Sequence, residues 1–408
     1  MPLALVDVAI IGAGLSGLTC ANILQRAGLQ VVVIEKSRGY GGRAATKRIG
    51  TSATSSERAD HGLRFLKRAR NTAESRYSCE DALQAQLTDR LVKQGVLTSW
   101  PAQVQHFRKT GVTTVLKDGD PDVQLYVAPE GANSIGKALA LNTNVWLDQR
   151  LVRMRGSGNF VDPWQLELES TIENSVYPQR LSARSVVFSC PPEQSAEILR
   201  RGANAASKST LEALDGVKYD KCIAAMCAIA DSDSLPRELA SFQCASFESH
   251  PLLAWAQLES SKRRQKHAVL TVHSSAQFGE EHFDNIEALP AAGETLLQTA
   301  LRHLGVTDTD ASFKRVARDR LVAHRWKYAF VRKPYSGGSF LSDELDASLV
   351  FCGDWCRAAS EADKPATLPS KSNVDAAHDT EHAGFALASG QDAANHVLCR
   401  LQQPKPSL

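Results

Sequence analysis

The chain of 408 residues carries 47 lysines and arginines against 45 aspartates and glutamates, a formal net charge of +2. This length exceeds what one hydrophobic core organises, so two domains are expected. The charge balance gives no broad basic field, which argues against nucleic acid as a partner. No apolar run reaches the roughly 18 residues of a membrane span, and no signal peptide is expected because an apolar strand begins within the first ten residues.

The cysteines argue against a disulfide framework. There are nine, an odd number, and no Cys-x-x-Cys pair occurs, so a zinc site is not expected either. Cys352 and Cys356 flank Gly353-Asp354-Trp355 and are either a redox pair or, as we favour, two ordinary reduced thiols. These features predict a metal-free protein of the reducing cytoplasm.

The N-terminal segment predicts a βαβ unit around a glycine-rich turn. Residues 8–11 and 31–34 are short apolar runs, typical of buried parallel strands. Residues 15–27 carry apolar side chains at helical spacing. The motif Gly12-x-Gly14-x-x-Gly17 joins the first strand to this helix, and Glu35 ends the second strand, 18 residues after Gly17.

Each part of this motif suits a dinucleotide. Gly12 allows the tight turn, Gly14 lets the backbone approach a pyrophosphate, and Gly17 lets the helix pack closely on the strand. The helix N-terminus faces the phosphates, and Glu35 can accept hydrogen bonds from ribose hydroxyls. The alternative is a glycine turn that holds no ligand.

Beyond this unit the chain alternates between predicted helices and short strands. The expected helices are residues 82–92, ended by Gly95, residues 131–141, capped by Asn133 or Ser134, residues 280–304, interrupted at Pro290, and residues 385–401. The expected strands are residues 112–116, 124–127, 145–154, 164–168, 185–189, 223–230, 252–257, 268–273 and 349–352. Those after residue 200 alternate with turns, which predicts an antiparallel sheet in a second domain.

Three polar segments are predicted to lie at the surface. Residues 46–57 are small and polar and predict an exposed loop. The basic run Lys262-Arg263-Arg264, with Lys266, predicts a solvated hairpin turn in preference to a nucleic-acid patch. Residues 357–380 are rich in Ala, Ser, Asp, Lys and Pro, which predicts a mobile insertion.

Six blocks of the sequence resemble the renalase-like flavoproteins of the amine oxidase superfamily. In order along nearly the whole chain, they are residues 12–17 with Glu35, 41–48 (Gly-Gly-Arg-Ala-Ala-Thr-Lys-Arg), 60–62 (Asp-His-Gly), 126–135, 324–329 (His-Arg-Trp-Lys-Tyr-Ala) and 351–356. The first block is shared by many FAD proteins, whereas residues 127–131 and 324–329 are more particular to renalase-like proteins. The chain departs from the family at the insertion 357–380, and at Gly384, where an acidic residue is expected unless Glu381 takes its part.

The resemblance implies an α/β fold, with a discontinuous Rossmann-like FAD-binding domain and a second, mainly antiparallel-sheet substrate domain. Residues 1–66, 129–198 and 345–402 would form the first domain, and residues 67–128 and 199–344 the second. The implied cofactor is non-covalent FAD. The implied cofactor-binding residues are Gly12, Ala13, Gly14, Leu15, Ser16, Gly17, Glu35, Lys36, Gly42, Arg43, Gly62, Val152, Gly353 and Asp354.

The activity that the resemblance implies is that of a flavin-dependent oxidase. Isomers of dihydro-NAD(P) would pass a hydride to the flavin and then to oxygen, giving NAD(P)⁺ and hydrogen peroxide. Because the nicotinamide ring becomes aromatic without losing a proton, positioning can supply most of the rate and no general base is essential. The candidate catalytic residues are His61, Trp326 and Tyr328, each of which can instead be a packing residue.

Other functions stay open. An amine oxidase or desaturase of the same superfamily would hold its substrate between aromatic side chains, which Trp326, Tyr328 and Phe330 can offer. An NAD(P)H-dependent reductase is disfavoured because no second Gly-x-Gly-x-x-Gly follows a predicted strand. A non-catalytic flavin-binding protein is the remaining alternative, and the substrate, the electron acceptor and the oligomeric state are left open.

Overall fold

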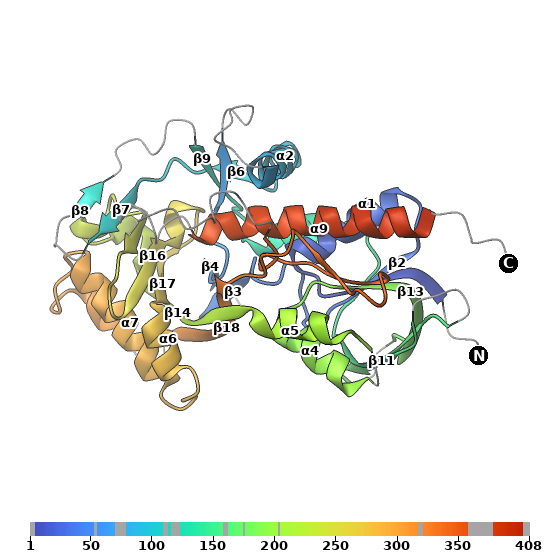
Figure 1. Ribbon diagram of the computed structural model, residues 1–408. Coiled ribbons are helices and arrows are strands. Elements are labelled where there is room, and N and C mark those ends of the chain that lie inside the picture. The colour runs from blue at the N-terminus through green and yellow to red at the C-terminus, as the bar shows by residue number, and fades with distance from the viewer. Residues whose placement is uncertain are drawn as a thin grey trace, which may run out of the picture.

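The computed structural model describes residues 5–52, 55–69, 79–108, 113–115, 123–157, 162–173, 176–202, 205–316, 321–357 and 378–402. Their strands form an eight-stranded and a seven-stranded sheet, with two smaller sheets beside them. Helices pack against both large sheets (Figure 1). This is the α/β class that the sequence predicts.

Parallel pairing defines the centre of the eight-stranded sheet. In spatial order the sheet contains β10 (Val145–Trp146), β2 (Val31–Ile34), β1 (Leu5–Ile11), β13 (Arg180–Phe188), β12 (Trp164–Ser170) and β11 (Gln149–Arg155), with β20 (Leu349–Phe351) on β13 and β19 (Leu341–Ser342) on β20. β1 pairs parallel with β2 and β13, and β13 pairs parallel with β20. α1 (Leu15–Arg26) connects β1 to β2, which confirms the predicted βαβ unit.

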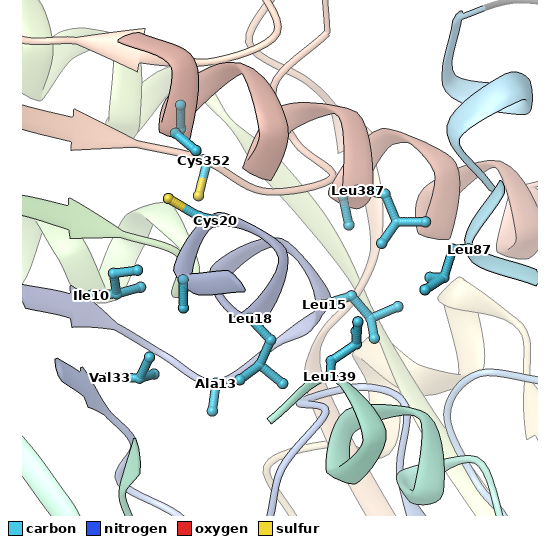
Figure 2. Packing of buried hydrophobic residues seen from close by; sticks show 14 of the residues in the cluster. Ile10, Ala13, Leu15, Leu18, Cys20, Val33, Leu87, Leu139, Cys352 and Leu387 are labelled. Carbon is cyan, nitrogen blue, oxygen red and sulfur yellow. The ribbon is translucent and has the colours of Figure 1, made fainter. Parts of the chain in front are cut away.

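Helices cover both faces of this sheet, as its doubly buried strands require. α1 and α9 (His378–Gln402) pack on one face, and α4 (Pro192–Arg201) and α5 (Lys208–Gly216) on the other (Figure 1). Figure 2 shows part of the first layer, in which Ile10 and Val33 from the strands and Leu18 of α1 belong to one buried cluster. α2 (Cys79–Lys93) and α3 (Asn133–Leu139) add Leu87 and Leu139 to the same cluster. This core holds the turn between β1 and α1 in place.

The seven-stranded sheet is mainly antiparallel, as predicted for the region after residue 200. Its order is β18 (Val322–Lys333), β14 (Lys218–Asp231), β17 (His267–Ser274), β16 (Leu253–Leu258), β15 (Cys244–Phe247), β7 (Val104–Phe107) and β8 (Thr113–Val115). α6 (Ala276–His282), α7 (Leu289–His303) and α8 (Ala311–Arg315) pack on one face of this sheet. Pro290 lies in the first turn of α7, where the predicted helix was expected to be interrupted.

The remaining elements are short. β3 (Thr46–Ser52) pairs with β4 (Ser55–Asp60), and β9 (Val123–Val127) pairs with β5 (Leu66–Ala69) and β6 (Thr98–Ser99). Short 3-10 helices cover Ser232–Ser234, Arg237–Leu239 and Glu259–Ser261. β8 and β9 join different sheets, and the residues between them in the sequence, 116–122, lie outside the described residues.

Residues 46–57, predicted to be an exposed loop, form most of the hairpin β3–β4. Two apolar side chains, Ile49 and Ala59, are buried against Met226 and Val269 of the second sheet. The prediction was wrong because most side chains of these two strands are polar, and this composition is also typical of exposed loops. The hairpin is stabilised by the sheet it packs on, which local composition does not show.

Three further boundaries differ from the prediction. Residues 145–154 are two strands, because β10 pairs parallel with β2 while β11 pairs antiparallel with β12, and the chain turns between them at Asp148, whose φ is 56°. α3 is capped by neither Asn133 nor Ser134. Its N-cap is Ala132, and the amides of Ala132 and Asn133 donate to Asp60 Oδ1 and Thr46 Oγ1. α9 begins at His378, before the predicted residue 385, and includes Gly384.

The domain boundaries stay a prediction. The two large sheets draw most of their strands from the two predicted sets of residues, although β19 lies before the boundary expected at residue 345. α2, assigned by prediction to the substrate domain, packs in the core of the first sheet. The predicted insertion 357–380 falls almost wholly outside the described residues. Across the part of the chain that is described, no helix is both long and apolar enough to cross a bilayer.

Candidate functional site

A cavity of about 1100 Å³ lies between the two large sheets. The turn after β1, the end of β2 and the segment after β13 line one side, and β14, β17 and β18 contribute to the other. Small-molecule sites commonly measure about 300–1,000 Å³. A cavity slightly larger than this range has room for a cofactor together with a substrate.

The first side of the cavity is made of main chain, and we call Gly12, Gly14 and Gly42 the glycine wall. Gly12 has a φ of 108° and Gly42 of 60°, conformations that glycine adopts without strain. A Cβ on Gly14 would meet no atom within 4 Å, so this backbone faces open space at the N-terminus of α1. A Cβ on Gly17 would lie 2.3 Å from Gly12 O and Ser189 Oγ, which is the close packing that the motif predicts.

Glu35 lies beside the glycine wall at the end of β2. Its Oε2 accepts from the Ala13 amide at 2.7 Å, and its Oε1 accepts from the Ser37 amide at 2.8 Å. Each carboxylate oxygen can accept more than one hydrogen bond, and Glu35 lines the cavity. The side chain therefore fixes the turn and keeps acceptor capacity for hydroxyl groups.

Arg43 and Asp354 form a bidentate ion pair inside the cavity. Arg43 Nη1 donates to Asp354 Oδ2 at 2.8 Å, and Nη2 donates to Oδ1 at 2.6 Å. Nη1 also lies 3.3 Å from the carbonyl oxygen of Ala329, on β18. The carboxylate of Asp354 is buried. Planar pairs of this kind are strong and directional, so the pair fixes the segment after β2 against the segment after β20, and the contact with Ala329 connects Arg43 to the second sheet.

The opposite side is made of rings, and we call His61, His273, His324 and Trp326 the histidine wall. The rings of His61 and Trp326 are stacked at 5.2 Å, and His324 lies edge-on to both, at 4.6 Å from His61 and 4.5 Å from Trp326. Trp326 Nε1 donates to the carbonyl oxygen of His61 at 2.7 Å. Strand register places His324, Ala224 and His273 in one row across β18, β14 and β17.

The imidazoles of this wall are held neutral. Burial, with the nearby His324 and Lys47, lowers the pKa of His61 to about 3. Burial, with Lys47 and Arg325, lowers the pKa of His324 to about 4. Burial and Arg64 hold the pKa of His273 well below its usual range. All three rings are therefore uncharged near neutral pH.

A buried ion cluster stands behind the histidine wall and corrects the prediction for two residues of the basic run. The run connects the antiparallel strands β16 and β17, as a hairpin turn would, and its Arg264 and Lys266 are exposed. Lys262 and Arg263 are not solvated: their side chains are 0% and 4% exposed. They pair with Asp60, the residue before His61, and lie near Glu259. Although burial opposes ionisation, Lys262 and Arg263 hold the pKa of Asp60 below its usual range. The carbonyl oxygen of Asp60 also accepts from Gln257 Nε2 at 3.0 Å, so the cluster positions the chain at His61.

Most of the predicted site residues line the cavity. Those that do are Gly12, Gly14, Leu15, Ser16, Glu35, Lys36, Gly42, Arg43, His61, Gly62, Trp326, Tyr328, Gly353 and Asp354. Ala13, Gly17 and Val152 are not in its lining. Ala13 acts through its bond to Glu35, and Gly17 packs on Ser189. Val152 sits at a register shift in β11, and the neighbouring Arg150 and Leu151 reach the cavity instead.

The prediction missed Tyr219, His273 and Trp355, which also line the cavity. His273 ends the predicted strand 268–273, whereas Tyr219 lies on β14 ahead of the predicted strand 223–230. Nothing in the local pattern marks the face that meets the cavity. Trp355 was inside a recognised block without a role of its own. Cys352 and Cys356 are free and buried, and burial raises the pKa of Cys352 to about 12, as suits an inert thiol. The described residues contain no group of three or more side chains suited to a metal ion.

Comparisons with known proteins agree with this architecture. A family model described as an NAD(P)-binding Rossmann-like domain matches residues 10–77. A variant of putrescine oxidase has a TM-score of 0.65 at 14% identity, covering 98% of this chain and 100% of that chain. Cyclohexylamine oxidase from Brevibacterium oxydans IH-35A has a TM-score of 0.61 at 12% identity, with coverage of 98% and 100%. A flavoprotein/dehydrogenase from Cytophaga hutchinsonii has a TM-score of 0.53 at 13% identity, with coverage of 99% and 80%.

These likenesses define the class of fold. The chain has the fold of the flavin amine oxidases, built on an NAD(P)-binding Rossmann-like domain. At these identities the likeness concerns the fold, so the reaction has to be argued from the cavity.

Proposed function

We propose that this chain is an FAD-dependent oxidoreductase. The observation that carries the proposal is the open space above Gly14, at the N-terminus of α1 and beside Glu35. Main-chain amides at a helix N-terminus suit phosphate groups, and an acid at the end of the second strand suits a ribose diol. The cavity has room for more than the dinucleotide, which supports a substrate held against the cofactor.

Two polar atoms of the cavity lining lack a hydrogen-bond partner within the described part of the chain, which supports a polar ligand such as the cofactor. Tyr219 Oη and Trp355 Nε1 are buried there, and neither has a hydrogen-bond partner among the described residues. An unsatisfied buried polar group costs roughly 1–3 kcal/mol, which a polar ligand would relieve. The glycine wall, Glu35, Lys36 and the Arg43–Asp354 pair would hold FAD, with no covalent link.

The attachment of the cofactor is directly testable. The purified protein should be yellow, and acid precipitation should release the flavin into the supernatant. Colour that stays in the pellet would contradict non-covalent binding. A colourless protein that takes up no added FAD would contradict the whole proposal.

For the reaction we infer a renalase-like oxidase that acts on isomers of dihydro-NAD(P). Bound FAD supplies hydride acceptance, and oxygen then takes the electrons to give hydrogen peroxide. The chain itself contributes orientation and exclusion of water. A base with a pKa of about 3, such as His61, is far from the value that favours proton abstraction at neutral pH. Oxidation of a dihydropyridine needs no such step, which supports this substrate class.

The test is anaerobic mixing of the holoprotein with each reductant while the oxidised-flavin band near 450 nm is followed. The 2- and 6-dihydro isomers should reduce the flavin much faster than 4-dihydro NADH or NADPH, because a displaced donor carbon can cost about a hundredfold. Fastest reduction by 4-dihydro NADPH would instead indicate a reductase.

An amine oxidase is the second candidate. The observation in its favour is the fold shared with putrescine oxidase and cyclohexylamine oxidase, together with the aromatic rings of Trp326 and Tyr328 in the cavity lining. Fastest flavin reduction by a primary amine in the same experiment would favour it.

A further inference from the structure

A second cavity lies beside the connection between β16 and β17. Its volume is about 630 Å³, within the range of small-molecule sites. The chain after β14, the chain ahead of β15, the end of β16 and the β16–β17 connection line it. Among the described residues, none lines both this cavity and the first one. A ligand of the second cavity would therefore be distinct from the cofactor and from the substrate.

Two N–H groups of this lining are buried without an acceptor. Arg263 Nε and Gln265 Nε2 have no hydrogen-bond partner within the described part of the chain, and the Arg263 side chain is only 4% exposed. Both Nη atoms of Arg263 are engaged elsewhere, because they donate to the carboxylate of Asp60. Gln265 Oε1 accepts from the Arg58 amide at 3.1 Å, which identifies the other end of this side-chain amide as a donor. Because buried polar groups are normally paired, these two donors indicate a ligand that supplies acceptors.

The charges near these donors favour an anion. Arg264 lies in the same lining and is exposed, and the carboxylate of the lining, Asp233, is exposed as well. The buried ion cluster behind Arg263 holds two cations against two carboxylates, so it presents no excess negative charge to the cavity. A cation would meet two donors and Arg264, whereas an anion would accept from the donors and be attracted by Arg264.

The apolar part of the lining suits an organic body behind the anionic group. Phe242 and Leu258 are buried in the wall of the cavity, and Leu235 is half-buried beside them in the same lining. Such side chains would pack on a hydrocarbon part of a ligand and would contribute nothing to a bare inorganic ion. Two buried donors also match the two oxygens of a carboxylate.

We propose that the second cavity binds a small organic carboxylate. Its two oxygens would accept from Arg263 Nε and Gln265 Nε2, and its apolar part would pack on Phe242 and Leu258. Arg264 would add a favourable charge at the exposed side. This inference goes beyond the proposed function and does not depend on it, because it concerns a separate cavity and holds or fails whether or not the protein binds FAD.

The experiment is a ligand-observed NMR titration of the protein as purified, with benzoate and benzamide as probes of similar shape and different charge. Benzoate should bind at least about tenfold more tightly, because hydrogen bonds to an ionised acceptor are the stronger ones. Gln265→Glu keeps the acceptor for the Arg58 amide but replaces the donor with an acid, and should weaken benzoate binding at least about tenfold. Arg264→Gln removes an exposed charge and should weaken it about threefold. Arg155→Gln, an exposed arginine on β11 outside both linings, is the matched control and should change nothing.

Equal affinity for the two probes, or no saturable binding of benzoate, overturns the proposal, and this comparison needs no variant to fold. Unchanged benzoate affinity in folded Gln265→Glu places the anion outside the second cavity and also overturns the proposal. If Gln265→Glu does not fold, Arg264→Gln decides the location, because its side chain is exposed and its loss leaves the buried cluster intact. Benzoate affinity equal to that of Arg155→Gln in this variant then overturns the proposal.

Discussion

The glycine wall and the histidine wall face the same cavity but are built in different ways. The glycine wall is main chain, shaped by turns at Gly12 and Gly42 and by the N-terminus of α1. The histidine wall consists of side chains from β17, β18 and the segment after β4. The first and last of these segments are more than 200 residues apart in the sequence. Backbone amides suit phosphates in general, whereas a set of fixed rings suits one shape and charge. Under the proposed function, the glycine wall binds the cofactor.

The two walls also differ in what supports them. Glu35 holds the glycine wall by accepting from two amides near it, at Ala13 and Ser37. The histidine wall depends on the buried cluster of Asp60, Glu259, Lys262 and Arg263, which joins the end of the β3–β4 hairpin to the connection between β16 and β17. Removing one member of such a cluster leaves a buried charge uncompensated. Substitutions can therefore damage either wall separately.

The largest effect is expected from Arg263→Met. Asp60 would lose its closest cation, and breaking a buried pair commonly costs about 3–5 kcal/mol. The free energy of unfolding, measured by urea titration, should fall by this order. Arg200→Met is the control, because the Arg200–Asp215 pair is about half exposed and should contribute less than about 1 kcal/mol. Equal effects of the two substitutions would show that the cluster does not support the wall.

The second-largest effect is expected from Gly14→Val, which should weaken cofactor binding without affecting folding. Gly14 has a φ of −74°, which any residue adopts, and open space where a side chain would lie. Gly14→Val should therefore leave the unfolding free energy nearly unchanged, while its methyl groups occupy the place proposed for the pyrophosphate. FAD affinity should fall at least about a hundredfold, or ~2.7 kcal/mol. Gly216→Ala, equally free of close contacts and outside the cavity lining, is the control. Full FAD retention in Gly14→Val would place the cofactor elsewhere.

The glycine wall was largely predictable because its determinants are local. Gly12, Gly14, Gly17 and Glu35 lie within one βαβ unit, and strand, turn and helix each have a periodicity or a residue type that marks them. Local pairing of β1 with β2 then brings Glu35 to the turn. The main strands of the seven-stranded sheet were predictable for the same reason, because they alternate with turns along the sequence.

The histidine wall was not predictable because strand register decides it. His273 and His324 become neighbours only when β17 and β18 both pair with β14 in the observed register, and a shift by one residue would turn either ring to the other face. The basic run was misread for a similar reason. A run such as Lys262-Arg263 is usually solvated, and only the tertiary placement of Asp60 and Glu259 makes its burial tolerable.

Glu35→Ala tests the acid of the glycine wall. Each charge-assisted hydrogen bond to a ribose hydroxyl is worth roughly 1.5–3 kcal/mol, so FAD affinity should fall by about one to two orders of magnitude. The amides of Ala13 and Ser37 also lose their acceptor, so some loosening of the turn is included in the effect. Glu169→Ala, an exposed acid on β12, is the control. Unchanged FAD affinity in Glu35→Ala would make Glu35 an ordinary strand-end acid.

The smallest expected effect is on the pH dependence of the unfolding free energy, which tests whether the imidazoles of the histidine wall are uncharged. Histidine in an unfolded chain titrates near 6.5, and burial with His324 and Lys47 lowers the pKa of His61 in the fold to about 3. Between these two pH values, His61 binds a proton in the unfolded chain but not in the folded chain. This histidine therefore leaves stability untouched above about pH 6.5 and reduces it as pH falls toward 3, by about 1.4 kcal/mol per pH unit. His324, with a pKa of about 4, acts in the same direction.

Urea titrations between about pH 6.5 and 5 isolate this contribution, because most carboxylates titrate below that window. His61→Phe removes the titrating ring while keeping a ring of comparable shape beside Trp326, so its unfolding free energy should depend less steeply on pH than that of the unaltered chain. The slope of the unaltered chain is the reference. If His61→Phe keeps that slope, His61 is charged in the folded protein, and the neutrality inferred for this ring of the histidine wall is wrong.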